Sequence, residues 1–215
     1  MINRFVLFLI KQNSFLDCYF SLYLAFKGSD NLSSFVALDF ETANGQPESI
    51  CSVGMVKVVD HHITENFYTL VNPKDYFSKF NIKIHGIHPS DVENSPTFDK
   101  VFPYMMDFIG DLPVVAHNAK FDMNVLFKSL VKLNIDVPNI TYFCSCILAR
   151  KTVDNHRYGL DPMMKYYNID FKGHHHALND AKACAIITFR LLKYYPDLNT
   201  VLSIYGKTLS DKKYV

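Results

Sequence analysis

The stretch FVALDFET, residues 35–42, combines the pattern of a β-strand with two carboxylates. Phe35 to Phe40 is a short apolar run rich in strand-forming residues, and side chains two apart on a strand point to the same face. Asp39 and Glu41 are therefore expected on one face, with Phe40 pointing the other way into packing. Two carboxylates side by side on an apolar strand repel each other and are costly to desolvate, which favours a compensating cation.

The Asp-x-Glu pair is weak evidence when it stands alone. About one chance match is expected in a chain of this length. The alternative is that both acids are solvated charges at the end of a strand. Other segments of the chain must decide between these interpretations.

Alternating elements surround this stretch and predict the fold class. Residues 49–59 and 62–71 have the pattern of two further strands, and short turns between the three strands predict an antiparallel meander. Further along, helical and strand patterns alternate, and together they predict an α/β fold with a mixed sheet flanked by helices. Catalytic residues then tend to gather at strand ends and helix starts. The expected helices are 98–109, 119–133, 146–153, 160–167 and 177–192, and the expected strands are 112–116 and 140–143.

A second acidic segment is VVAHNAKFD, residues 114–122, in which a buried strand ends in a polar turn. Asp122 falls in the first turn of the following helix, where the helix dipole favours a carboxylate. The same position is commonplace for an acid with a purely structural role. Asn118 has the place of an ordinary N-cap residue.

A third segment is GHHHALNDAKACA, residues 173–185. Its small residues at 177, 181 and 185 recur every four positions, which predicts a helix face that packs closely on the sheet, with Asp180 at the neighbouring edge. His175 lies before this helix on a loop that begins with a glycine. A soft-metal site is disfavoured, because adjacent imidazoles rarely converge on one ion and no cysteine is near in sequence. We expect one histidine of the triplet to take part in chemistry.

Composition bounds the class of protein. The chain has 215 residues, of which 49% are hydrophobic, enough for one well-buried domain. Its 22 basic and 21 acidic residues give a net charge of +1, so any nucleic-acid function must rest on a local site. Five cysteines without a Cys-x-x-Cys pair fit reduced thiols and a cytoplasmic location.

The beginning of the chain differs from the rest. Its two apolar patches, Phe5 to Ile10 and Cys18 to Phe26, are shorter than the roughly 18 to 20 apolar residues of a bilayer span, and a signal-peptide pattern is poor. We therefore expect no membrane association. The predicted organisation is an N-terminal extension over residues 1–34 with no assigned role, a catalytic domain over 35–195 and a C-terminal tail over 196–215.

Taken together, the three acidic segments resemble the motifs of the DEDDh exonuclease family, which includes proofreading subunits of bacterial DNA polymerase III. The motifs occur in the family's order, and the resemblance spans roughly residues 35–192. His85-Gly86-Ile87 also resembles a family segment near the terminal nucleotide. The three motif matches are DFET at 39–42, HNAKFD at 117–122 and HHALNDA at 175–181.

The resemblance implies a ribonuclease-H-like fold and hydrolysis of phosphodiesters from the 3′ end by two Mg²⁺ or Mn²⁺ ions. Four carboxylates without a thiolate suit such hard cations. In the family's arrangement Asp39 bridges both ions, Glu41 and Asp180 complete the first site, and Asp122 serves the second. His175 then acts as the general base, a role that suits a side chain that ordinarily titrates near neutral pH.

The resemblance also gives expectations for substrate and partners. The implied substrate is a single-stranded or frayed 3′ end of DNA, with a role in DNA replication or repair and a polymerase or other nucleic-acid machinery as partner. One alternative is an exoribonuclease that trims short RNAs, and another is a non-catalytic nucleic-acid adaptor of the same fold. A plain α/β domain with scattered acids would require three coincidences in order. The residues expected to hold the terminal nucleotide are Thr42, His85, Gly86, Ile87 and Asn118.

Overall fold

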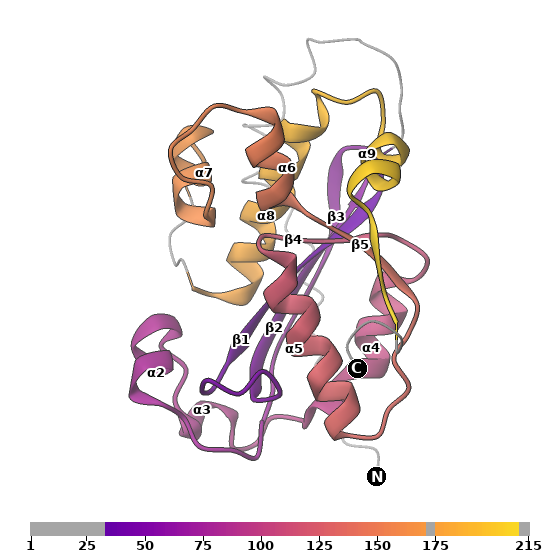
Figure 1. The fold of residues 1–215 in the computed structure, drawn as a ribbon. Helices are drawn as coiled ribbons and strands as arrows, with labels where there is room; N and C mark the ends of the chain where they lie inside the picture. The colour runs from indigo at the N-terminus through magenta and orange to yellow at the C-terminus, as the bar shows by residue number, and fades with distance from the viewer. Residues whose placement is uncertain (1–32, 171–174, 211–215) are drawn as a thin grey trace.

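A six-stranded mixed sheet forms the centre of the computed structural model, which describes residues 33–170 and 175–210 (Figure 1). The strand order is β3-β2-β1-β4-β5-β6. β1, β4 and β5 run parallel, whereas β2 and β3 continue from β1 as an antiparallel meander and β6 is antiparallel to β5. The strands are β1 (Phe35–Thr42), β2 (Ile50–Val59), β3 (His62–Leu70), β4 (Val114–Ala116), β5 (Ile140–Cys144) and β6 (Lys207–Leu209).

Helices cover both faces of this sheet, which confirms the predicted fold class. The five helices and five strands expected from periodicity are all present, with bounds that differ by a few residues. α2, α3, α9 and β6 were not predicted from the sequence. The helices are α2 (Lys79–His85), α3 (Pro89–Val92), α4 (Phe98–Ile109), α5 (Ala119–Lys132), α6 (Ser145–Thr152), α7 (Leu160–Tyr166), α8 (Ala177–Leu192) and α9 (Leu198–Tyr205).

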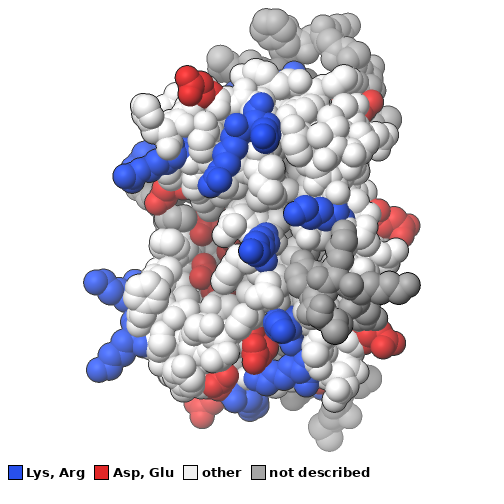
Figure 2. All heavy atoms as spheres, viewed as in Figure 1, with Lys and Arg blue, Asp and Glu red and all other residues white. Residues whose placement is uncertain are grey.

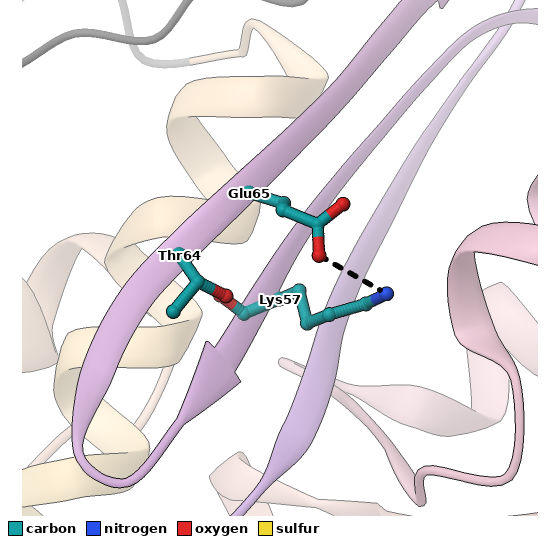
Figure 3. A network of polar contacts seen from close by, with 3 residues as sticks. All are labelled: Lys57, Thr64 and Glu65. Atoms are coloured by element: carbon teal, nitrogen blue, oxygen red, sulfur yellow. Dashed lines mark hydrogen bonds and ion pairs between the residues drawn. The ribbon is translucent and has the colours of Figure 1, made fainter.

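The β2–β3 hairpin is fastened by polar contacts that Figure 3 shows from close by. The Nζ of Lys57 lies 3.4 Å from Oε1 of Glu65, its cross-strand partner. Thr64 donates a hydrogen bond of 3.4 Å to the carbonyl oxygen of Lys57. The Lys57 ammonium also lies 4.8 Å from the ring centroid of Phe108 in α4, so this side chain ties the hairpin to a helix.

Alternate residues of β1 belong to two separate cores. Val36, Leu38 and Phe40 pack with α4 and α5, and the Phe40 ring meets Phe98 edge-on with centroids 6.3 Å apart. Phe35 and Ala37 belong to the opposite core, to which α6, α7, α8 and α9 contribute. Because Asp39 and Glu41 continue the second series, they lie on the α8 face, as the strand periodicity predicts.

Gly54 of β2 allows the start of α8 to approach the sheet closely. A Cβ at this position would lie 2.3 Å from the carbonyl carbon of Ala177 and 2.3 Å from the backbone nitrogen of Leu178. Gly54 is also the cross-strand partner of Asp39. The absent side chain therefore brings the first turn of α8, which carries Asp180, beside the strand that carries Asp39.

We expect Gly54→Ala to destabilise the protein, because the new methyl group meets backbone atoms that must shift. Overpacking of this kind costs about 1 to 3 kcal/mol. Chemical denaturation should show this loss in the free energy of unfolding. Gly45→Ala is the matched control, since nothing lies within 4 Å of a Cβ there. Equal stability of the two variants would contradict the close approach.

The sequence predicts an extension over residues 1–34 and a tail over residues 196–215. The predicted extension falls almost wholly on residues 1–32, outside the described residues. Within the predicted tail, β6 pairs with β5 and Leu198, Val201 and Leu209 are buried, so residues 198–209 pack with the domain. In the described part of the chain, no helix is long and apolar enough to cross a membrane.

Candidate active site

The sheet topology brings the three acidic segments to one place. β1 and β4 are parallel neighbours, so the end of β1 that carries Asp39 and Glu41 lies beside the start of α5. There, Oδ1 of Asp122 accepts a hydrogen bond of 3.3 Å from the backbone N–H of Phe40. Asp180 lies in the first turn of α8. Figure 2 shows acidic side chains inside a hollow between the surface over α7 and the surface over α2.

Burial and mutual repulsion act on the carboxyl groups of this site. Burial raises the pKa of Asp39 well above its usual range, and the nearby charges of Asp122, Glu41 and Asp180 raise it further. Burial, followed by Asp180 and Asp122, raises the pKa of Glu41 to about 8. Burial also raises the pKa of Asp122 to about 7, although the backbone N–H bonds it accepts act in the opposite direction. The folded protein therefore holds these acids in an unfavourable electrostatic state.

A divalent cation fits this donor set. Oxygen ligands suit hard ions, and a cation would relieve the repulsion between the buried carboxylates. Glu41, His175 and Asp180 each place one ligand atom within 4.8 Å of the others. No ion pair among residues 33–170 and 175–210 involves Asp39, Glu41 or Asp122. Within the described part of the chain, these three acids therefore lack a balancing ion pair, and a bound cation would supply the opposite charge.

The raised pKa values predict how stability depends on pH without metal. An acid whose pKa is higher in the folded than in the unfolded protein stabilises the fold while it is protonated. This contribution is complete below the unfolded value near pH 4 and is lost as the pH rises through about 7 for Asp122 and about 8 for Glu41.

In EDTA the melting temperature should therefore fall between pH 5 and pH 8. Mn²⁺ should raise it most at the upper end of that range, where the carboxylates are ionised. Scanning calorimetry across this range, with and without the ion, measures both effects. A melting temperature that rises steadily with pH in EDTA would contradict the electrostatic account.

His175 lies at the mouth of the site, immediately before α8. Its backbone adopts a left-handed φ of 64°, and its N–H donates a hydrogen bond of 3.2 Å to Oδ2 of Asp180. The side chain is exposed, yet a ring nitrogen lies near Glu41 and Asp180. The structure thus brings together the histidine and the carboxylates that the sequence singled out. His174 lies outside the described residues.

Thr42 and His85, two of the predicted substrate residues, are joined at the end of β1. Ile87 donates its backbone N–H to Nδ1 of His85, so the neutral ring carries its proton on Nε2 and donates to the carbonyl oxygen of Thr42 at 3.2 Å. Burial lowers the pKa of His85, in agreement with a neutral ring. Asn81 of α2 donates a second bond of 2.7 Å to the same carbonyl oxygen. α2 is thereby fixed beside the carboxylates.

The remaining predicted substrate residues border the same region. Gly86 ends α2 with a left-handed φ of 73°, and its N–H donates to the carbonyl oxygen of Ile82 at 2.8 Å. Asn118 precedes α5 with a φ of 79°, is exposed, and makes no side-chain capping bond. The interpretation of Asn118 as an ordinary capping side chain therefore does not hold. Its left-handed backbone turns the chain sharply between β4 and Asp122.

Two positioning contacts were missed by the sequence analysis. The His176 ring stacks on Tyr68 of β3 with centroids 4.4 Å apart, which anchors the residue next to His175 on the sheet. His117 donates from Nε2 to the carbonyl oxygen of Tyr158 at 2.8 Å, and its Nδ1 lies 2.9 Å from Oγ of Ser145. Neither contact has a signal in the sequence. The close approach of α8 to Gly54 does have one, because a glycine within a strand often marks a place where another backbone comes near.

Comparisons with known proteins agree with this geometry. Residues 36–188 match the exonuclease family RNase_T. The chain is 33% identical over 162 residues to the PolC-type DNA polymerase III of Caldanaerobacter subterraneus subsp. tengcongensis, covering 74% of this chain but 12% of the polymerase. It is 28% identical to the DNA polymerase III subunit epsilon of Buchnera aphidicola subsp. Baizongia pistaciae, covering 80% of this chain and 74% of that subunit.

A solved structure extends the comparison to three dimensions. Exonuclease X, in complex with 5′-overhanging duplex DNA, superposes with a TM-score of 0.62 at 25% identity, covering 74% of this chain and 91% of that one. The shared sheet and flanking helices confirm a ribonuclease-H-like architecture. Because the family match covers most of the chain and includes all three acidic segments, the protein belongs to the exonuclease family.

Proposed function

We propose that this protein is a 3′-to-5′ exonuclease that uses two divalent ions, Mg²⁺ or Mn²⁺, to release 5′-mononucleotides from a single-stranded or frayed 3′ end of DNA. The observation that carries the proposal is the convergence of carboxyl groups from β1, α5 and α8, because Asp122, Glu41 and Asp180 all act electrostatically on Asp39 and two of them are buried. These carboxyl groups have no structural benefit by themselves, because their ionised forms repel one another and burial opposes their ionisation.

The roles of the residues follow from their positions. Asp39, Glu41, Asp122 and Asp180 would hold the ions, which polarise the phosphate and favour ionisation of the attacking water when bound. His175 is exposed at the mouth of the site and would accept the proton of that water. Thr42 at the end of β1 would receive the terminal nucleotide together with Gly86, Ile87 and His85, whose ring contacts the Thr42 carbonyl oxygen. Asn118 would contribute from its position just before α5.

DNA is favoured as the substrate because the epsilon subunit and exonuclease X, both similar over most of their own length, are a DNA polymerase subunit and a DNA-bound exonuclease. An exoribonuclease remains the second candidate, since the same carboxylates would serve either sugar. A DNA polymerase is the proposed partner on the same ground.

We expect faster release of mononucleotides from single-stranded DNA than from RNA of the same sequence, in Mg²⁺ and not in EDTA. Absence of release from both strands by folded protein would contradict the proposal.

A further inference from the structure

A basic pocket is lined by residues of α6, of α7 and of the segment between them. Its volume is about 530 Å³, and no acidic side chain lines it. Two guanidinium groups, an imidazole and a phenol ring give it the chemistry of an anion site. In Figure 2, Lys and Arg side chains are spread over the surface of α6 and α7, above the acidic hollow. The lining residues are Arg150, His156, Arg157, Tyr158, Gly159 and Pro162.

The pocket is tied to the candidate active site by a direct contact. His117 follows β4 and lies five residues before Asp122. Its hydrogen bond of 2.8 Å to the carbonyl oxygen of Tyr158 joins the backbone of the pocket to the turn that positions Asp122. The pocket is therefore joined by one hydrogen bond to the segment that leads to Asp122.

The aromatic side of the pocket is held in place. The Tyr158 hydroxyl donates to the carbonyl oxygen of Val153 at 3.1 Å and accepts the backbone N–H of Asn155 at 3.2 Å. The guanidinium of Arg150 lies 5.9 Å from the centroid of the same ring. A guanidinium stacked on a fixed ring retains the N–H donors along its edge, which match a phosphate.

Charge explains why such a site is needed here. The ions proposed for the hollow would act on the phosphate that is cleaved, and a net charge of +1 supplies no general attraction for the rest of the backbone. We propose that the pocket is a subsite for a backbone phosphate of the single-stranded substrate, upstream of the nucleotide being removed. Arg150 and Arg157 are the binding groups, and Tyr158 positions Arg150. This inference rests on the proposed exonuclease function.

The test compares a long and a minimal substrate. Arg150→Gln and Arg157→Gln should each raise the KM for a twelve-residue oligothymidylate by about 3-fold to 10-fold. Hydrolysis of the p-nitrophenyl ester of thymidine 5′-monophosphate, which has no upstream phosphate, should change less than 2-fold. Each variant should also flatten the dependence of log(kcat/KM) on log[NaCl] for the oligonucleotide by about 0.7.

Lys132→Gln is the matched control, because it removes one charge from the far end of α5. It should leave the KM and the salt dependence unchanged. The subsite is wrong if the wild type digests the oligonucleotide while both arginine variants keep its KM, if both substrates suffer equally, or if Lys132→Gln has the same effect. Failure of the wild type on both substrates would instead contradict the proposed function. Arg157 does not stack on Tyr158, so its variant answers the question even where Arg150→Gln impairs folding.

Discussion

Replacing Asp39 with asparagine is expected to lower kcat by at least about 10³-fold while the protein stays folded. Asp39 lies centrally in the site, with the charges of Asp122, Glu41 and Asp180 all acting on it. Asparagine has the same shape but no negative charge, so it would weaken the hold on both proposed ions. Loss of one preorganised electrostatic contact typically lowers the rate by about 10² to 10³. Asp39 is proposed to contact both ions, so its replacement would remove more than one such contact and lower the rate further.

The same substitution should stabilise the protein in EDTA. Removing one of several repelling buried carboxylates lowers the electrostatic cost of folding. Melting curves and steady-state rates of the same preparation measure both effects. Asp111→Asn, in the exposed turn between α4 and β4, is the matched control and should change neither property. Full turnover by folded Asp39→Asn would remove Asp39 from the proposed metal site.

The second large effect is expected at His175. Replacement with alanine should lower kcat by about 10² to 10⁴, the usual cost of losing a general base. The Mg²⁺ concentration for half-maximal activity should change little, because we assign this side chain to proton transfer. His175→Asn is a useful second variant, since asparagine tolerates the left-handed backbone at this position but does not accept the proton.

Two readouts separate a base from a metal ligand. Exogenous imidazole should restore part of the activity of His175→Ala, whereas additional Mg²⁺ should not. The distinction matters because His175 shares a 4.8 Å cluster with Glu41 and Asp180, a geometry that also suits a ligand. His174→Ala serves as the control with near-normal activity. His176 is unsuitable for that purpose, because its ring stacks on Tyr68. Full rescue of His175→Ala by Mg²⁺ would reassign the residue to the metal site.

Periodicity predicted most of the fold, and the order of the motifs predicted that the three acidic segments lie close together, as they do in the structure. The alternation along β1 placed Phe40 in one core and Asp39 and Glu41 on the other face, as the structure shows. Recurring small residues predicted that α8 packs closely, and Ala177, Ala181 and Ala185 are fully buried. These features depend on local sequence alone, which is why they could be predicted.

Features that depend on distant partners were not predicted. α2 buries none of its residues, so it shows little apolar periodicity, and contacts from Asn81 and His85 to Thr42 fix it instead. β6 has three residues and gains its place from pairing with β5. The stack of His176 on Tyr68 joins residues more than a hundred positions apart. Such contacts leave no periodic signal.

Directional digestion tests the central claim most directly. A single-stranded DNA oligonucleotide would be labelled at its 5′ end in one sample and at its 3′-terminal nucleotide in another, then incubated with Mg²⁺. We expect the 5′ label to pass through successively shorter fragments, while the 3′ label is released at once as a 5′-mononucleotide. Early release of the 5′ label as a mononucleotide, or internal cleavage into long fragments, would contradict the account.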